Sequence, residues 1–239
     1  MASSLPFLAA MSAPTFAQEA EEGAENVENI IVTGTRMSNR SAADSPVPVD
    51  VITGEEFRSN SSSDVQDMLR TNVPSFDVNT QPISDAATIV RPANMRGLSP
   101  DNVLVLVNGK RRHRCSIISF LGGGSSDGAQ GVDISAIPSL ALKQVEVLRD
   151  GASSQYGSDA IAGVLNFLLR DNDEGFEFRA NYGSTYEGDG DNYTISANAG
   201  FSLGDKGFVN VTGEIRDVEG TARSVVRDDV AGMVDAGYI

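Results

Sequence analysis

The stretch of residues 144–167 constrains the fold of this chain more than any other. A short apolar run from Gln144 to Leu148 leads to an Asp-Gly pair, then to a corner of small residues, and then to a second apolar run from Val164 to Phe167. Asp-Gly and clusters of Ser, Gly and Ala mark turns, so the two apolar runs are predicted to be strands. Short apolar strands joined by such corners suit a domain that packs inside a larger structure.

The composition fits short strands and excludes one function class. The 239 residues include 24 Gly and no Trp, and 40% of them are hydrophobic, which suits one or two domains with many turns. No apolar run reaches the roughly 18 residues that a membrane-spanning helix needs. The net charge of -15 argues against general nucleic-acid binding, because that function needs a basic face.

Residues 44–170 have the pattern of a small α+β domain. An edge strand is predicted over residues 46–52, because its prolines are tolerated only where no hydrogen-bond donor is required. Capping-box patterns follow at residues 53–56 and 63–66, where a hydroxyl and a carboxylate or amide can satisfy the first amides of a helix. The second of these helices is predicted to stop before Pro74.

Another strand is predicted over Val103–Val107, because a continuous apolar run suits a strand that is buried on both faces. Asn108-Gly109 closes this run, and Asn-Gly is a strong signal for a tight turn with positive backbone angles. The basic segment 110–114 and a glycine-rich stretch at 120–128 come next and predict a long loop. Long loops between rigid strands are where binding functions tend to lie.

From Phe176 onwards, three runs alternate strictly between apolar and polar residues. The apolar positions are Phe176, Phe178, Ala180 and Tyr182 in the first run, Tyr193, Ile195, Ala197, Ala199, Phe201 and Leu203 in the second, and Val209, Val211, Gly213 and Ile215 in the third. A membrane-barrel strand requires one lipid-facing apolar face and one polar face, and these runs are long enough to cross. An ordinary soluble antiparallel sheet shows the same alternation. Residues 204–207 predict a tight turn and residues 183–191 a longer loop.

Three segments, 144–167, Asn94–Leu98 and Val103–Arg111, together resemble the plug domain of TonB-dependent outer-membrane receptors. The resemblance implies an α+β plug domain over residues 44–170, followed over 171–239 by the first antiparallel strands of an incomplete transmembrane β-barrel. Plugged transporters of this kind use 22 strands, so the chain is expected to be an N-terminal fragment. Alone, its final strands are expected to be poorly stable and prone to aggregate.

The resemblance implies TonB-dependent active transport of a scarce solute, such as an iron chelate, cobalamin or a carbohydrate, across the outer membrane. The implied partners are the TonB energising protein, outer-membrane lipid and a small-molecule solute, with no nucleic acid. The implied location is the outer membrane of a Gram-negative cell, with the plug and the N-terminus facing the periplasm. Neither a cofactor nor a catalytic residue is expected, because this transport requires no covalent chemistry.

The N-terminal region reads as an export signal followed by a leader. Residues 1–17 include a short apolar stretch and small residues before Gln18, which is typical of a signal-peptide remnant, although the basic residues that normally start one are missing. Residues 18–43 are predicted to be a flexible periplasmic leader. Within it, residues 28–36 resemble the Ton box that TonB binds; the candidate TonB-binding residues are Ile30, Ile31, Val32, Thr33 and Gly34. The alternative is the first strand of the folded domain.

Two plug loops touch the solute in the resembling family, and residues 79–87 and 111–128 occupy their positions. The candidate solute-binding residues are Asn79, Gln81, Arg112, His113, Arg114 and Phe120. Guanidinium groups can hold an anionic or polyhydroxylated ligand, while the alternative is that the basic cluster pairs with the barrel wall. The single histidine does not suggest a metal site, because no second histidine is present.

Arginines of the plug face glutamates on the barrel wall in the resembling family. Arg96 and Arg149 stand where such plug-barrel locks are expected. The alternative is an ordinary ion pair of these arginines with Glu146 or Asp150. Two rival function classes remain: a secreted enzyme, for which His113 among cations is a poor base, and a soluble binding or adhesion module, which would leave the leader motif without a role.

Overall fold

A computed structural model describes most of the chain beyond its N-terminal region. The described residues are 30–31, 33, 40–41, 48–59, 62, 64–78, 87–119, 126–149, 153–204, 206–221 and 228–238. The expected signal peptide, most of the leader, and the candidates Val32, Gly34, Asn79, Gln81 and Phe120 lie outside these ranges.

A five-stranded mixed sheet forms the centre of the α/β domain, the name used here for residues 48–170. Its strands, in spatial order, are β3 (Val49–Thr53), β8 (Leu142–Leu148), β9 (Gly163–Leu169), β6 (Val103–Val107) and β7 (Lys110–Arg111). The β6 and β9 strands are parallel and the other neighbours antiparallel. The predicted edge position of β3, the buried strand β6 and the turn with positive φ at Asn108 and Gly109 are confirmed.

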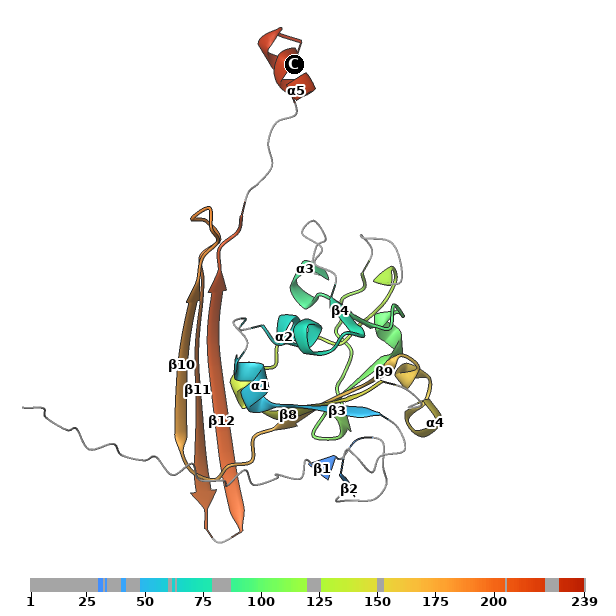
Figure 1. Cartoon of the computed structure of the whole chain (residues 1–239), viewed down its shortest axis with the longest axis vertical. Coiled ribbons are helices and arrows are strands. Elements are labelled where there is room, and N and C mark those ends of the chain that lie inside the picture. The colour runs from blue at the N-terminus through green and yellow to red at the C-terminus, as the bar shows by residue number, and fades with distance from the viewer. Residues whose placement is uncertain are drawn as a thin grey trace, which may run out of the picture.

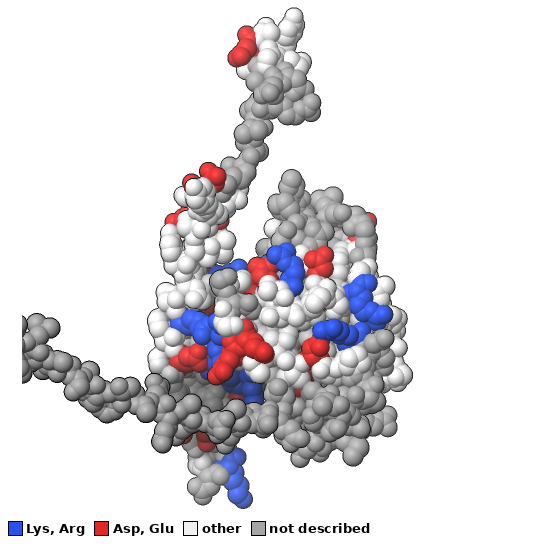
Figure 2. Space-filling view, in the orientation of Figure 1, with Lys and Arg blue, Asp and Glu red and all other residues white. Residues whose placement is uncertain are grey.

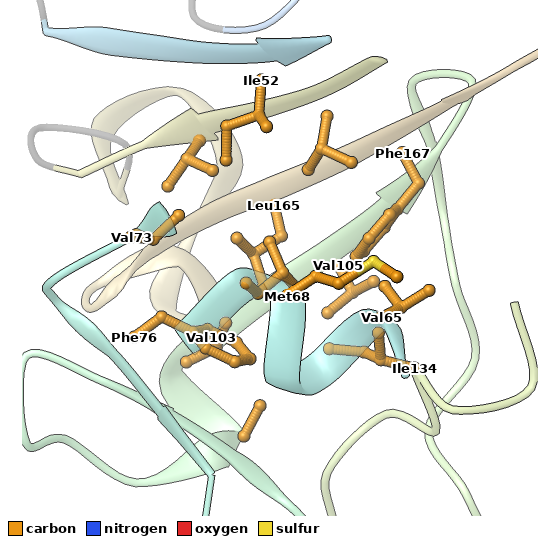
Figure 3. Close-up of a cluster of buried hydrophobic side chains, with 14 of the residues drawn as sticks. Ile52, Val65, Met68, Val73, Phe76, Val103, Val105, Ile134, Leu165 and Phe167 are labelled. Atoms are coloured by element: carbon orange, nitrogen blue, oxygen red, sulfur yellow. The ribbon is translucent and has the colours of Figure 1, made fainter. Parts of the chain in front are cut away.

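One face of this sheet carries the helices and the main core (Figure 1). Helices α1 (Gly54–Ser59) and α2 (Val65–Asn72) lie over it, and a hairpin of β4 (Phe76–Val78) and β5 (Ala93–Met95) follows α2. Figure 3 shows the α2 side chains and the sheet side chains meeting; the labelled members include Val65, Met68 and Val73 on the helix side and Val103, Val105, Leu165 and Phe167 on the sheet side. These side chains are buried, so this face supplies most of the domain's hydrophobic stabilisation.

The capping interactions agree with the sequence for α1 and correct it for α2. At α1, the Thr53 amide donates to Glu56 Oε2 at 2.7 Å and the Glu56 amide donates to Thr53 Oγ1 at 3.2 Å, as the capping box predicts. At α2 the cap is Asp64 instead of the expected Ser63, because the Asp64 carboxylate accepts from the Gln66 amide at 2.8 Å.

The opposite face of the sheet carries a smaller apolar cluster and the described part of the leader. Val49, Leu104, Leu106, Leu148 and Val164 are buried there. The leader contributes β1 (Ile30–Ile31) and β2 (Arg40–Ser41), which pair with each other and lie on the side of the sheet away from α1 and α2 (Figure 1). Within the described residues, the other short elements are α3 (Ala87–Val90), α4 (Ser153–Tyr156) and the 3-10 turns η2 (Pro100–Asn102), η4 (Ser139–Ala141) and η5 (Ser158–Ala160).

A separate three-stranded antiparallel sheet stands beside the α/β domain and is called the wall sheet here. It consists of β10 (Phe176–Gly183), β11 (Asn192–Leu203) and β12 (Gly207–Val218), with β11 in the middle. The short β11–β12 turn lies at the same end of the molecule as β1 and β2, and the longer β10–β11 loop lies at the other end (Figure 1). Helix α5 (Asp228–Asp235) follows the wall sheet in the chain.

Within the described ranges, none of the helices is long and apolar enough to cross a membrane.

Candidate functional site

The wall sheet turns its polar face inward. Thr194, Ser196 and Asn198 of β11 are only 2–3% exposed, whereas Phe176 is 72% and Ile215 is 68% exposed. The other exposed apolar side chains of this sheet are Phe178, Tyr182, Tyr193, Ile195, Phe201, Leu203, Phe208, Val209, Val211 and Val218. Because a soluble two-layer sheet packs its apolar face on the core, this arrangement is the reverse of the one that water favours.

A buried carboxylate joins the α/β domain to the wall sheet. Asp64 is 2% exposed, and it accepts a hydrogen bond at 2.7 Å from Arg216 Nη1 of β12 as well as one from Arg91. Burial alone would raise the pKa of the Asp64 carboxyl, but the Arg216 hydrogen bond and the charges of both arginines outweigh it and hold that pKa below its ordinary value. The Asp64 side chain that caps α2 therefore also binds the wall sheet through Arg216.

A second ionic contact joins the two regions near the start of β10. Glu177 pairs with Arg170 at 2.7 Å and with Arg58 at 3.7 Å. Arg179 of β10 donates to the Arg58 carbonyl at 2.8 Å. Burial, followed by the charge of Arg170, lowers the pKa of Arg58, while the charge of Glu177 opposes them. Arg179 also lies 3.9 Å from Glu177, so basic side chains of both regions converge on one wall carboxylate.

The arginines singled out by resemblance are held within the α/β domain. Arg149 forms an ion pair with Asp50 of β3, and Arg96 Nη1 donates to the Arg149 carbonyl at 3.3 Å. The alternative from sequence, an internal ion pair, is therefore present for Arg149, although its partner is Asp50. Sequence reasoning did not identify Asp64 or Arg58 as contacts to the wall, and only the carboxylate at a helix start hinted at Asp64.

The described part of the leader contacts the α/β domain at Thr33. This residue is 1% exposed, and its amide donates to Glu146 Oε2 at 2.9 Å. Its hydroxyl bonds to the same oxygen and accepts from Asn166 Nδ2 at 2.9 Å. Of the five candidate TonB-binding residues, Ile30, Ile31 and Thr33 are within the described residues.

Residues 111–114 of the basic segment line two cavities, and Arg112 also lines a third of about 280 Å³. One of about 320 Å³ is lined by Arg111, Arg112, His113 and Arg114, and another of about 460 Å³ by the last three of these with Cys115. Arg111 forms an ion pair with Asp159, and Arg114 lies 3.6 Å from Asp101. The structure therefore places Arg112, His113 and Arg114 around the same cavities. The charges of Arg111 and Arg114 are partly balanced by Asp159 and Asp101 of the same domain.

On the face of the molecule drawn in Figure 2, positive and negative side chains of the described residues are interspersed. Figure 2 shows the Lys and Arg side chains of this face beside Asp and Glu side chains, in small groups, over the described residues. Within the described ranges, no group of three or more His, Cys, Asp or Glu side chains is arranged to hold a metal ion.

The fold and the inverted sheet define a class: a compact domain seated against a wall whose apolar side faces outward. The TonB-dependent Receptor Plug Domain family matches residues 41–164, which is more than half of the chain. The chain belongs to this family.

Solved structures of siderophore receptors share the fold. The ferric enterobactin receptor PfeA of Pseudomonas aeruginosa, as an R480A mutant in complex with enterobactin, is 22% identical with a TM-score of 0.57; the match covers 72% of this chain and 25% of that one. The siderophore receptor PirA of Acinetobacter baumannii is 24% identical with a TM-score of 0.56, over 71% of this chain and 24% of that one. The chain thus spans about a quarter of the length of these receptors.

These comparisons confirm the predicted fold class. The chain has an α/β plug domain followed by antiparallel strands, and the three strands of the wall sheet do not close on themselves, so the barrel is incomplete in the described residues. The barrel-wall interpretation of the alternating runs is favoured over the soluble sheet by the direction in which the apolar face points.

Proposed function

We propose that this chain forms the plug and first wall strands of a TonB-dependent transporter, which carries a scarce small-molecule solute across the outer membrane. The observation that carries the proposal is the wall sheet, whose exposed side is apolar and whose polar side packs on the α/β domain. A lipid environment makes that orientation favourable. A soluble binding or adhesion module, the alternative from sequence, would expose this apolar surface to water.

The proposed orientation places the leader in the periplasm. The leader strands and the short β11–β12 turn lie at one end of the molecule, and the longer β10–β11 loop lies at the other (Figure 1). Outer-membrane barrels have short periplasmic turns and longer outer loops, so the leader end is the periplasmic end. Transport needs no covalent step from any side chain, and we propose no enzymatic activity.

The leader is proposed to bind the TonB energising protein by strand addition through Ile30, Ile31, Val32, Thr33 and Gly34. Calorimetry with the periplasmic domain of a TonB protein and a peptide of residues 28–36 tests this. Proline at Ile31 should abolish binding, because proline lacks the amide donor that a strand needs. The matched Ile31→Ala peptide keeps its backbone donors and should bind. Equal binding by both variants would exclude strand addition at this residue.

The solute is proposed to contact the loops at 79–87 and 111–128, including Asn79, Gln81, Arg112, His113, Arg114 and Phe120. Arg112 lines both cavities of the basic segment, which supports a role in binding an anionic or polyhydroxylated ligand. Binding of a ferric chelate and of a neutral oligosaccharide should be compared in the wild type and in Arg112→Ala. Loss of chelate binding alone supports an anionic solute, and unchanged binding of both ligands removes Arg112 from the site. Arg96 and Arg149 remain proposed as residues that secure the plug.

A further inference from the structure

The sheet face beneath the leader contains two buried polar residues where an apolar pair would be expected. Glu146 of β8 and Asn166 of β9 are cross-strand partners, and both are 0% exposed. Their strand neighbours Val145 and Phe167 point into the main core, so these two side chains project from the other face. That face is otherwise lined by Leu104, Leu106, Leu148 and Val164 in its apolar cluster.

A buried carboxylate is costly unless its oxygens accept hydrogen bonds. Around Glu146, Gln144 Nε2 donates to Oε1 at 3.1 Å and Asn166 Nδ2 donates to Oε2 at 3.2 Å. The leader donates two hydrogen bonds to Oε2, one from the backbone amide and one from the hydroxyl of Thr33. The leader therefore supplies hydrogen bonds to a charge that the sheet has buried.

The orientation of the Asn166 side chain is fixed by a hydrogen bond from the turn between β6 and β7. The Gly109 amide, in the turn between β6 and β7, donates to Asn166 Oδ1 at 3.0 Å. With its oxygen held there, the amide group of Asn166 presents its NH₂ to both Glu146 Oε2 and Thr33 Oγ1. The pair is thus preorganised to receive one residue of an extended peptide.

We infer that Glu146 and Asn166 form a docking site for the leader, centred on Thr33, which holds the leader against the sheet. Thr33 is also one of the residues proposed to bind the energising partner. The inference rests on that proposed function: the docking site and the partner compete for the same segment of the leader. Glu146 and Asn166 are positioning residues, because they act through the leader.

Tryptic cleavage of the full chain in detergent tests the docking site without any partner. Trypsin can cut the leader after Arg36 and Arg40, and intact-mass spectrometry measures the rate. Thr33→Val and Glu146→Gln should each speed cleavage about tenfold, since each removes hydrogen bonds to a charged group. The double variant should be no faster than the faster single variant, because both changes break one contact. The control Glu55→Gln makes the same chemical change on the exposed side of α1 and should leave the rate unchanged.

A thermal melt of each variant separates leader release from unfolding. If Glu146→Gln unfolds the domain, Thr33→Val decides the question, because it alters only the leader. Wild-type cleavage rates in a folded Thr33→Val chain would overturn the docking site. In a parallel experiment, the periplasmic domain of TonB should bind Glu146→Gln more tightly than the wild type. If it binds neither, the proposed function fails, whereas accelerated cleavage still supports the docking site.

Discussion

The five-stranded sheet and the wall sheet are both built of strands whose side chains alternate between two faces, yet the two sheets bury opposite kinds of side chain. In the α/β domain, the side chains that pack between layers are apolar, such as Leu165 and Phe167, both 0% exposed. In the wall sheet, the packed side chains are polar, such as Ser196 and Asn198, and the apolar ones face outward. Alternation alone therefore specifies a two-faced strand, and the surroundings decide which face is buried.

The junction between the two regions follows from this difference. Because the wall presents polar groups to the α/β domain, contact between them is made by hydrogen bonds and ion pairs, such as Arg216 with Asp64 and Arg170 with Glu177. Such contacts are directional, and they can be exchanged for water or for other polar partners at less cost than an apolar core. Under the proposed transport function, an interface of this kind would let the plug shift against its wall.

The largest expected effect comes from removing one aromatic side chain from each of the two sheets. Phe167→Ala should destabilise the α/β domain by about 3–5 kcal/mol, because it leaves a cavity in a close-packed core. Phe176→Ala, on the outer side of the wall sheet at 72% exposure, should change the unfolding free energy of that domain little. Urea denaturation followed by circular dichroism measures both. Equal losses would contradict the division into a packed core and an outward apolar face.

A charge placed on each face of β11 tests which side meets lipid. Ile195→Lys should weaken insertion into bilayers by about 2–4 kcal/mol if it lies near the midplane, because the charge loses its water. Ser196→Lys, one residue along and on the inner face, should leave insertion unchanged while disturbing the packing against the α/β domain. Liposome flotation measures the insertion. A stronger effect of Ser196→Lys on flotation would reverse the assigned faces.

Asp64→Asn tests the ionic contact across the junction. Asn still caps α2, so the variant removes the charge and keeps the cap. We expect a loss of about 1.5–3 kcal/mol at pH 7, since hydrogen bonds from Arg91 and Arg216 to a charged acceptor are replaced by bonds to a neutral one. Thermal unfolding measures the loss, and Arg216→Gln should reproduce part of it.

The same contact predicts a pH dependence. The pKa of Asp64 is lower in the folded chain than in the unfolded one, so its stabilisation is present above the unfolded pKa of about 3.9 and is lost as the pH falls through the folded pKa. The stability difference between wild type and Asp64→Asn should therefore shrink below about pH 4. A difference that stayed constant down to pH 2 would show that the charge does not provide it.

The smallest effect compares two glycines. Gly163 has φ +150°, and an added Cβ would lie 2.7 Å from the Leu148 carbonyl oxygen, so Gly163→Ala should cost about 1–3 kcal/mol. Nothing lies within 4 Å of the corresponding position at Gly213 in β12, so Gly213→Ala should be neutral or slightly stabilising. Chemical denaturation of the two variants would contradict this account if Gly213→Ala were the more damaging change.

Short-range patterns predicted much of the fold. The buried strand at Val103–Val107, its Asn-Gly turn, the capping box of α1 and the three alternating runs are all set by residues close together in the sequence. One local prediction was wrong at α2, where Asp64 takes the cap position expected for Ser63. A carboxylate and a hydroxyl are both good caps, so the choice between neighbours depends on surroundings such as Arg91 and Arg216.

Contacts between distant residues were not predictable in this way. Thr33 meets Glu146 across 113 residues, and Arg216 meets Asp64 across 152. Nothing local in the sequence marks these pairs, because each partner alone resembles an ordinary polar residue of a strand or helix end. Arg96 and Arg149, which resemblance did single out, lie together in the domain, and their proposed part in securing the plug stays a prediction.

The central position of β11 has a consequence for isotope exchange. From Asn192 to Ala199 this strand is paired with β10 on one side and β12 on the other, so deuterium should enter that part of it slowly. In the described sheet, β10 and β12 each have one outer edge, so every second amide there should exchange quickly. A further strand that docked on either side would erase that alternation on the side where it docked.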